Sequence, residues 1–492
     1  MINYSKSFQK LISKDSFKEV SSSELFYQLS YMSAVAGAGI ARNRIFELGA
    51  SLPRIPADYF KRVHLLAQKL GYDYASACTK VGLAVKSDAM ISLLLRLGNA
   101  LTSGQPEVDF LMEEAAVQGE AYEKEYERDL ESLTKWTDAY AAVSVSSALM
   151  IVINMTSSLI YDIGNNIILG LVITMLVIAT ATAWILSRAA PKEVIDLFSV
   201  EGTWPQRLAG QLSIYTIASV FILCPLLLLL GMAVGPILIL AAIILFPLGG
   251  VSMLAGREID KKDREFGPFL RSLGGMAVST GTTISEALSR IDLSSFPTLE
   301  SDLARLRSRL IAGVDPEICW RKFGLETGSK LIGETITIFN DAVRLGGDPD
   351  TVAFLAAEFS TKTIMLRAKR QVVASTFSWL TVVMHGTIAT LMVTILEIIR
   401  NFVAMIDVAA SALGEGGSQA AAMALPTFNT PEVGFFEIIT ICMVILLSVI
   451  NAYAIIATDG GHTYKAAFYL SLLLAFGGIS FIVVPPMVAG IL

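Results

Sequence analysis

Long stretches of this chain carry no Lys, Arg, Asp or Glu, and their lengths are those of helices that cross a membrane. About 20 apolar residues span the roughly 30 Å of hydrocarbon in a bilayer. The longest stretch, 208–256, has room for two crossings, with a turn expected at Gly231–Pro236. Seven spans are therefore predicted, two in 208–256 and one each in 139–161, 163–187, 371–396, 438–458 and 466–492.

The 38 basic and 44 acidic residues gather mainly in two blocks, which argues against a wholly lipid-buried protein. Residues 1–139 hold 16 Lys and Arg and residues 257–372 hold 17, so these blocks are expected to face water. The predicted organisation is a first helical domain at 1–138, four spans at 139–256, a second helical domain at 257–370, and three spans at 371–492 with an outer segment at 397–437.

Basic residues near span ends stay on the cytoplasmic side of a membrane. Arg188, Lys192, Arg207 and Lys465 place their loops there. Four spans separate the two charged blocks, so both blocks are expected in the cytoplasm together with the N-terminus. We expect a multi-pass protein of the cytoplasmic membrane, without a cleavable signal peptide because charges of both signs precede the first apolar run.

The two charged blocks resemble each other, which indicates an internal duplication. Residues Gly71–Gly82 return as Gly313–Gly324, with Gly, Asp, Lys and Gly in step at an offset of 242. Two further blocks return at offsets of 244 and 243. The repeated positions are Gly37, Gly71, Asp73, Gly82 and Gly104, with counterparts at Gly281, Gly313, Asp315, Gly324 and Gly347.

Apolar residues in both blocks recur at helical spacing, and prolines fall between the periodic segments. Each block is therefore predicted to be a bundle of about five or six helices, and the whole protein to be all-α. Gly37 and Gly281 are expected to make turns, and Asp73 and Asp315 to cap helix N-termini. The last helix of each block is expected to run unbroken into a span.

No catalytic or ligand-binding motif stands out. Gly324–Lys330 has the wrong glycine spacing for a phosphate-binding loop. The four cysteines form no Cys-x-x-Cys pair and the three histidines lie far apart, which supports no metal site. We expect a protein that is not an enzyme, with no cofactor, no metal and no nucleic-acid partner.

His385 is the one ionisable residue expected near the middle of a span. Such a residue is a candidate functional group by default. A neutral imidazole bonded to Thr381, or packed across a helix interface at Gly386, is the structural alternative.

The duplicated unit, followed by a span, resembles the type II secretion system F domain. The resemblance rests on Phe269–Leu273 leading to Gly281 and on Asn340–Gly347 before Phe354-Leu355. It covers roughly residues 24–162 and 268–396. The domain belongs to membrane platform proteins of type II secretion, type IV pili, Tad pili and archaella. The extra spans between the copies make this chain more similar to the archaeal members.

The resemblance implies a platform beneath a growing filament. It implies a hexameric secretion ATPase docked on the cytoplasmic domains, pilin-like or archaellin subunits as partners, and a homodimer within the lipid bilayer. It leaves open whether the filament is an archaellum or an adhesive pilus. A secondary transporter is the alternative function, since seven spans with an internal repeat also suggest alternating access.

The densest basic set of the second domain is a candidate surface for the ATPase. Arg305 and Arg309 would share a helix face, from which an acidic partner could be steered. A solvated helix face is the alternative interpretation. The candidate residues are Arg305, Arg307, Arg309, Arg321 and Lys322.

Overall fold

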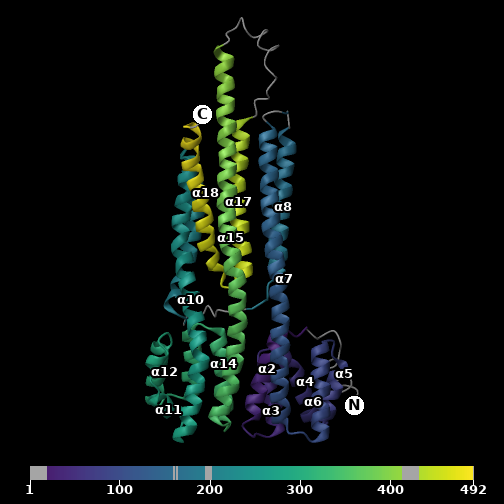
Figure 1. Ribbon diagram of the computed structural model, residues 1–492. Coiled ribbons are helices and arrows are strands. Elements are labelled where there is room, and N and C mark those ends of the chain that lie inside the picture. The colour runs from purple at the N-terminus through teal and green to yellow at the C-terminus, as the bar shows by residue number, and fades with distance from the viewer. Residues whose placement is uncertain (1–18, 159–160, 162–163, 194–201, 413–431, 491–492) are drawn as a thin grey trace. The chain divides into compact units, whose positions relative to one another are not determined.

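The structure is a computed structural model, which describes all 492 residues except 1–18, 159–160, 162–163, 194–201, 413–431 and 491–492 (Figure 1). Throughout the described residues the regular elements are helices, which confirms the predicted all-α fold. The chain divides into two compact units. Unit 1 comprises Met1–Arg128, Asp196–Thr203 and Glu258–Ala368, and unit 2 comprises Asp129–Ile195, Trp204–Arg257 and Lys369–Leu492.

Unit 1 contains two series of helices, one from each predicted domain. The first series consists of α2 (Ser22–Ala36), α3 (Arg42–Ser51), α4 (Ile55–Leu70), α5 (Tyr74–Ala84), α6 (Asp88–Ser103) and the start of α7 (Glu107–Ser157). The second consists of the end of α10 (Val234–Thr280), α11 (Ile284–Arg290), the 3-10 helix η2 (Leu293–Ser295), α12 (Glu300–Ile311), α13 (Pro316–Thr327), α14 (Lys330–Arg344) and the start of α15 (Pro349–Ala412).

The two series use the same residues to stop and start helices. Gly71 after α4 and Gly313 after α12 both have positive φ, at 69° and 76°, a region in which glycine meets no Cβ clash. Asp73 then caps α5 by accepting the N–H of Ser76, and Asp315 caps α13 by accepting the N–H of Glu317. The predicted N-caps are confirmed.

Two of the predicted glycine pairings are wrong by one or two residues. Gly37 ends α2 with an ordinary φ of −58°, and the left-handed turn comes at Gly39. Similarly, the positive φ after α14 belongs to Gly346, while Gly347 sits close to the carbonyl oxygen of Ala342. The positive-φ glycines of the first series, Gly39, Gly71 and Gly104, therefore recur at a constant offset of 242 as Gly281, Gly313 and Gly346.

Gly82 and Gly324 allow close helix contacts at matching places. A Cβ at Gly82 would lie 3.3 Å from Cβ of Leu94 on α6, and a Cβ at Gly324 would lie 3.3 Å from Cδ1 of Ile336 on α14. Leu94 and Ile336 are themselves 242 residues apart. Both series thus pack their fourth and fifth helices through the same contact.

Unit 2 contains the apolar helices. Seven helices of the described chain are long and apolar enough to cross a membrane, in agreement with the predicted count. The turn expected within 208–256 lies at Gly231, whose φ is 78°. Besides the remaining parts of α7, α10 and α15, unit 2 contains α8 (Asn165–Ala189), α9 (Trp204–Leu229), α17 (Val433–Asp459), the 3-10 helix η3 (Thr463–Lys465) and α18 (Ala466–Ala489).

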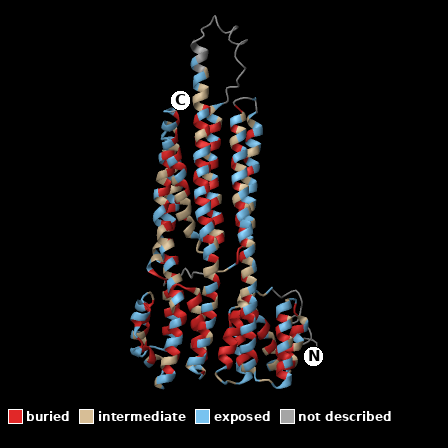
Figure 2. Ribbon diagram, in the orientation of Figure 1, coloured by how far each residue is buried: buried red, intermediate tan, exposed pale blue. Residues whose placement is uncertain are grey.

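Helix α15 is the most enclosed of these seven helices. Of its most apolar 18-residue stretch 61% is buried, against 11% for α9, and Figure 2 shows the contrast between buried and exposed faces along the long helices. The apolar side chains that remain exposed on α9, such as Phe221 and Leu229, are those that lipid would cover.

Helices α7, α10 and α15 each have residues in both units. The predicted continuity of 113–138 and 358–370 with the following spans is confirmed for α7 and α15. The continuity of α10 was not predicted. In addition, α15 continues to Ala412, past the expected span end at 396 and into the expected outer segment. Residues 413–431 of the expected outer segment 397–437 lie outside the described residues.

Candidate functional site

The five candidate basic residues lie on α12 and α13 of unit 1, where two of them are already paired. Arg309 donates to both carboxylate oxygens of Glu326, at 2.6 and 3.0 Å, and Nε of Arg305 lies 3.5 Å from the same carboxylate. Burial raises the pKa of Glu326, but the hydrogen bonds and charges of Arg309 and Arg305 outweigh it, so the pKa lies below its ordinary value.

Asp302 of α12 is a second carboxylate that pairs with Arg305. Its carboxylate is buried, pairs with Arg305, and lies 2.8 Å from Nζ of the buried Lys262 on α10. Arg305 and Arg309 therefore join α12 to α13 through Glu326, a pairing that neither the docking surface nor the solvated helix face anticipated.

The other three candidates differ from them. Arg321 and Lys322 are exposed and Arg307 is partly exposed, and none of the three forms an ion pair with a described residue. The structure therefore divides the predicted set into two paired residues, Arg305 and Arg309, and three residues without an ion pair to a described residue.

Polar and aromatic side chains join the two helix series within unit 1. Helix α2 is buried from Leu25 to Ala36 and packs against α14 of the second series. Tyr31 Oη donates to Oδ2 of Asp341 at 3.0 Å. Arg54, before α4, pairs with Glu334 of α14. We call these contacts, with those of the next paragraph, the seam.

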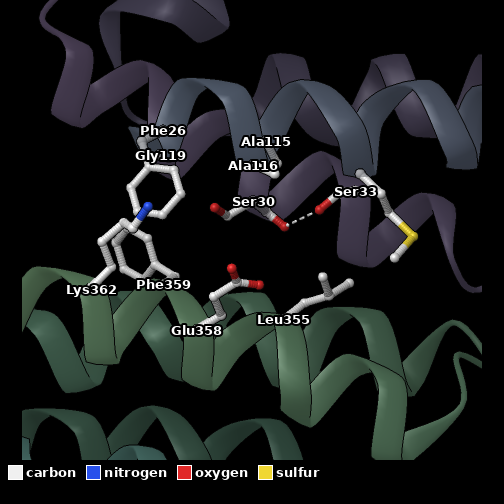
Figure 3. A pocket seen from close by; sticks show the side chains of 11 residues that line it. Phe26, Ser30, Ser33, Ala115, Ala116, Gly119, Leu355, Glu358, Phe359 and Lys362 are labelled. Atoms are coloured by element: carbon white, nitrogen blue, oxygen red, sulfur yellow. Dashed lines mark hydrogen bonds between the residues drawn. The ribbon is translucent and has the colours of Figure 1, made fainter. Parts of the chain in front are cut away.

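An aromatic cluster and a small pocket continue the seam between α2, α7 and α15 (Figure 3). The ring centroids of Phe26 and Phe359 lie 5.3 Å apart, and Nζ of Lys362 lies 3.4 Å from the carboxylate of Glu123. Among the lining hydroxyl groups, that of Ser33 donates to the carbonyl oxygen of Ser30 at 3.0 Å, a structural contact within α2.

We expect Asp341 to make the stability of the seam depend on pH. Burial raises its pKa above the ordinary value, although the hydrogen bond from Tyr31 and the charge of Arg344 act in the opposite direction. A raised folded-state pKa means that stability is lost as the pH rises through that pKa. We expect Asp341→Asn, which still accepts the Tyr31 hydrogen bond, to remove this loss, as measured by thermal unfolding of detergent-solubilised protein from about pH 4 to 8.

Asp348→Asn is the matched control with the opposite sign. Hydrogen bonds from Thr351 hold the pKa of Asp348 below its ordinary value, so its stabilising contribution is lost as the pH falls. A pH profile for Asp341→Asn that parallels the parent's would contradict the assignment of a raised pKa to Asp341.

In unit 2, His385 belongs to a closed hydrogen-bond chain on three helices. Tyr140 Oη donates to Oδ1 of Asn451 at 2.6 Å, and Nδ2 of Asn451 lies 3.1 Å from Nδ1 of His385. Nε2 of His385 lies 3.1 Å from Oγ of Ser448, which donates to the carbonyl of Val444. With Nε2 protonated, each member has a partner and the imidazole is neutral.

The expected bond from His385 to Thr381 is wrong, because Thr381 Oγ1 has no hydrogen-bond partner among the described residues. The other alternative, an imidazole bonded across a helix interface, agrees with the contacts to α17, and Gly386 lies at an interface with Phe476 of α18. The partners of His385, Ser448 and Asn451, both lie on α17, more than 60 residues away in the sequence, so local spacing could not identify them. The network favours a structural role for His385.

Tyr140→Phe is expected to lower the stability of unit 2 by about 1 kcal/mol, because it removes one buried hydrogen bond within the membrane helices. Thermal unfolding in detergent measures the effect. Tyr453→Phe, at an exposed position of α17, should leave the unfolding temperature unchanged. Equal unfolding temperatures for both variants would show that the network contributes nothing.

Arg370 is a further buried group that the sequence did not single out. It lies on α15 and donates to carbonyl oxygens in the last turn of α17 and in the chain just after α8. Among the described residues, no group of three or more His, Cys, Asp or Glu side chains could hold a metal ion.

Comparison with known proteins gives two curated relatives that match most of the chain. No family model matches, and no solved structure matches. Flagella accessory protein J of Methanocaldococcus jannaschii is 26% identical over 84% of this chain and 75% of its own length. The protein of the same name from Methanococcus voltae is 23% identical over 86% of this chain and 77% of its own length. The predicted similarity to the archaeal platform proteins is thereby confirmed, and this chain is similar to the flagella accessory proteins J over more than four fifths of its length.

Proposed function

We propose that this protein is the membrane platform of an archaellum or a related archaeal pilus. It would couple a cytoplasmic secretion ATPase to the insertion of pilin-like subunits into the filament. The observation that carries the proposal is the similarity, over more than four fifths of the chain, to two proteins named flagella accessory protein J. Their name favours the archaellum over an adhesive pilus.

Three continuous helices support a mechanical role. Because α7, α10 and α15 have residues in both units, force applied to unit 1 could reach the apolar helices without crossing a flexible linker. We place unit 1 and the N-terminus in the cytoplasm, since Arg188, Lys192, Arg207 and Lys465 favour that orientation. The ATPase would then act on unit 1.

We also propose that the two helix series are copies of one ancestral unit of the F-domain type. Positive-φ glycines recur at one constant offset, and α7 and α15 begin at Glu107 and Pro349, again 242 residues apart. A duplicated unit offers a partner two related surfaces. Two-fold assembly of the chain beneath the filament is part of the same proposal.

The contacts of His385 favour the platform over the transporter. The hydrogen-bond chain of His385 is complete with a neutral imidazole, so this residue has no free position at which to carry a proton for ion coupling. Nothing in the described residues favours the transporter.

The test is co-purification of the detergent-solubilised full chain with the secretion ATPase from the same cell, combined with deletion of the gene. We expect ATPase to bind with and without nucleotide, and the deletion strain to lose its filaments and regain them on complementation. A folded parent protein that binds no such ATPase, or a deletion strain with normal filaments, would overturn the proposal. Movement of a solute by reconstituted protein would favour the transporter.

A further inference from the structure

The turn between α12 and α13 presents apolar side chains to water. All eight residues from Ile311 to Ile318 are exposed. The exposed fractions of Ile311, Val314 and Ile318 are 70%, 40% and 48%. Unlike the exposed apolar residues of unit 2, these lie outside the helices that are apolar enough to enter a membrane. An exposed apolar cluster with a polar rim is typical of an interaction site.

The rim of this cluster is positive. Arg307 lies one turn before Ile311 on α12, and Arg321 and Lys322 lie one turn after Ile318 on α13, so each cation shares a helix face with an apolar residue. These are the three unpaired residues of the predicted basic set. We call the residues 311–318 with Arg307, Arg321 and Lys322 the α12–α13 corner.

The acidic residues of the α12–α13 corner are already engaged. Asp315 accepts the backbone N–H of Glu317, and the side chain of Glu317 pairs with Arg344. The corner therefore keeps a positive surplus for an outside partner.

The matching turn of the first series provides an internal comparison. There the ring of Tyr72 is covered by Lys80, whose Nζ lies 4.4 Å from the ring centroid. Tyr74 stacks on Phe46 at 4.5 Å and its hydroxyl lies 3.1 Å from Nδ1 of His64. This turn packs its two tyrosines against its own series and leaves Leu70 41% exposed, whereas the α12–α13 corner leaves Ile311, Val314 and Ile318 uncovered.

The position of the corner within unit 1 favours a protein partner over lipid. The Glu317–Arg344 pair places the corner beside the turn that leads into α15. From Pro349, α15 runs 20 residues before it leaves unit 1 at Ala368, a helix length of about 30 Å. The corner thus lies at the end of unit 1 opposite to the one where α15 departs.

We propose that the α12–α13 corner is the docking surface for a soluble protein partner that presents an acidic, amphipathic element. The apolar residues of the partner would cover Ile311, Val314 and Ile318, and its carboxylates would meet the three unpaired cations. Charge complementarity speeds association, and exclusion of water from the apolar centre supplies affinity. The proposal rests on the proposed platform function, in which the secretion ATPase is that partner.

Two variants of the full chain test the corner by ATPase binding in detergent. Arg321→Glu with Lys322→Glu is expected to weaken binding at least tenfold at low salt, with a smaller effect at high salt. Ile311→Ser with Ile318→Ser is expected to weaken it about tenfold, with little dependence on salt. All four side chains are exposed, so both variants should unfold at the parent's temperature.

The first series supplies the matched control. Leu70→Ser with Lys80→Glu alters the equivalent turn, in which Lys80 occupies the position of Lys322. This variant should bind ATPase within twofold of the parent.

If the parent binds ATPase and both corner variants bind equally well, the docking surface is wrong while the platform function stands. A folded parent that binds no ATPase overturns both. Corner variants that keep ATPase binding but lose association with anionic vesicles would assign the corner to lipid instead and overturn protein docking.

Discussion

Replacing Gly249 by alanine is expected to force helices α10 and α18 apart. A Cβ at Gly249 would lie 2.2 Å from the backbone nitrogen and 2.4 Å from Cα of Phe468 on α18. Backbone atoms cannot rotate away as a side chain can, so the helices themselves must move. The same two helices approach closely at Gly235 and Gly478, where a Cβ on Gly478 would lie 2.9 Å from the carbonyl oxygen of Gly235. Small residues allow such close approach between membrane helices.

The expected loss for Gly249→Ala is about 3 kcal/mol, at the upper end of the range for overpacked interiors. The separation would also loosen the apolar cluster that α10 and α18 share, which includes Leu245, Leu248 and Leu474. Thermal unfolding and size-exclusion chromatography in detergent would report the change as a lower unfolding temperature and a broader peak.

The adjacent residue provides the control. A Cβ at Gly250 would meet nothing within 4 Å, so Gly250→Ala should be neutral, or stabilising by up to about 1 kcal/mol through helix propensity. Similar unfolding temperatures for Gly249→Ala and Gly250→Ala would contradict the close crossing of α10 and α18.

The local features of the fold could be predicted from the sequence, because their causes lie within a few residues. An aspartate two residues after a glycine predicted the caps at Asp73 and Asp315, and the charge-free runs predicted the apolar helices. The glycine pairings failed at Gly37 and Gly347 because two glycines close together, as in Gly37 and Gly39, have equal freedom, and only the backbone decides which adopts positive φ.

The candidate site was predicted only in part, because pairing is a tertiary property. The sequence could group five basic residues, but it could not show that Arg305 and Arg309 both pair with the carboxylate of Glu326. Nor could it show that Lys262 of α10 pairs with Asp302.

The sequence also placed a domain boundary at 257, where charges begin. In the structure α10 passes through that point, since charged residues do not end a helix.

Arg370→Ala is expected to destabilise unit 2 by on the order of 3 kcal/mol, because Arg370 satisfies carbonyl groups that would otherwise be buried without partners. The side chain is 3% exposed. Nε donates to the carbonyl of Thr458 at 2.8 Å, Nη1 to that of Pro191 at 2.8 Å, and Nη2 to that of Ala457 at 3.2 Å. Thr458 and Ala457 belong to the last turn of α17, where helix carbonyls have no partner within the helix.

The charge of Arg370 also suits its position. The C-terminal end of a helix carries partial negative charge, which a cation stabilises. Gly460 makes room for the guanidinium, since a Cβ there would lie 2.3 Å from Cζ of Arg370. Arg370 thus holds the end of α17 and the chain after α8 against α15, and no sequence pattern indicates this because Pro191 and Thr458 are distant in the chain.

Two further variants separate the hydrogen bonds of Arg370 from its charge. Arg370→Lys keeps the charge but loses the planar, forked donor set, so its unfolding temperature in detergent should fall between those of the parent and Arg370→Ala. Arg188→Ala removes an exposed cation from the last turn of α8, 5.1 Å from the ring of Trp184, and should change stability by less than about 1 kcal/mol. If Arg370→Ala unfolds at the same temperature as Arg188→Ala, the three carbonyls must find other partners, and Arg370 is then dispensable for holding α8, α15 and α17 together.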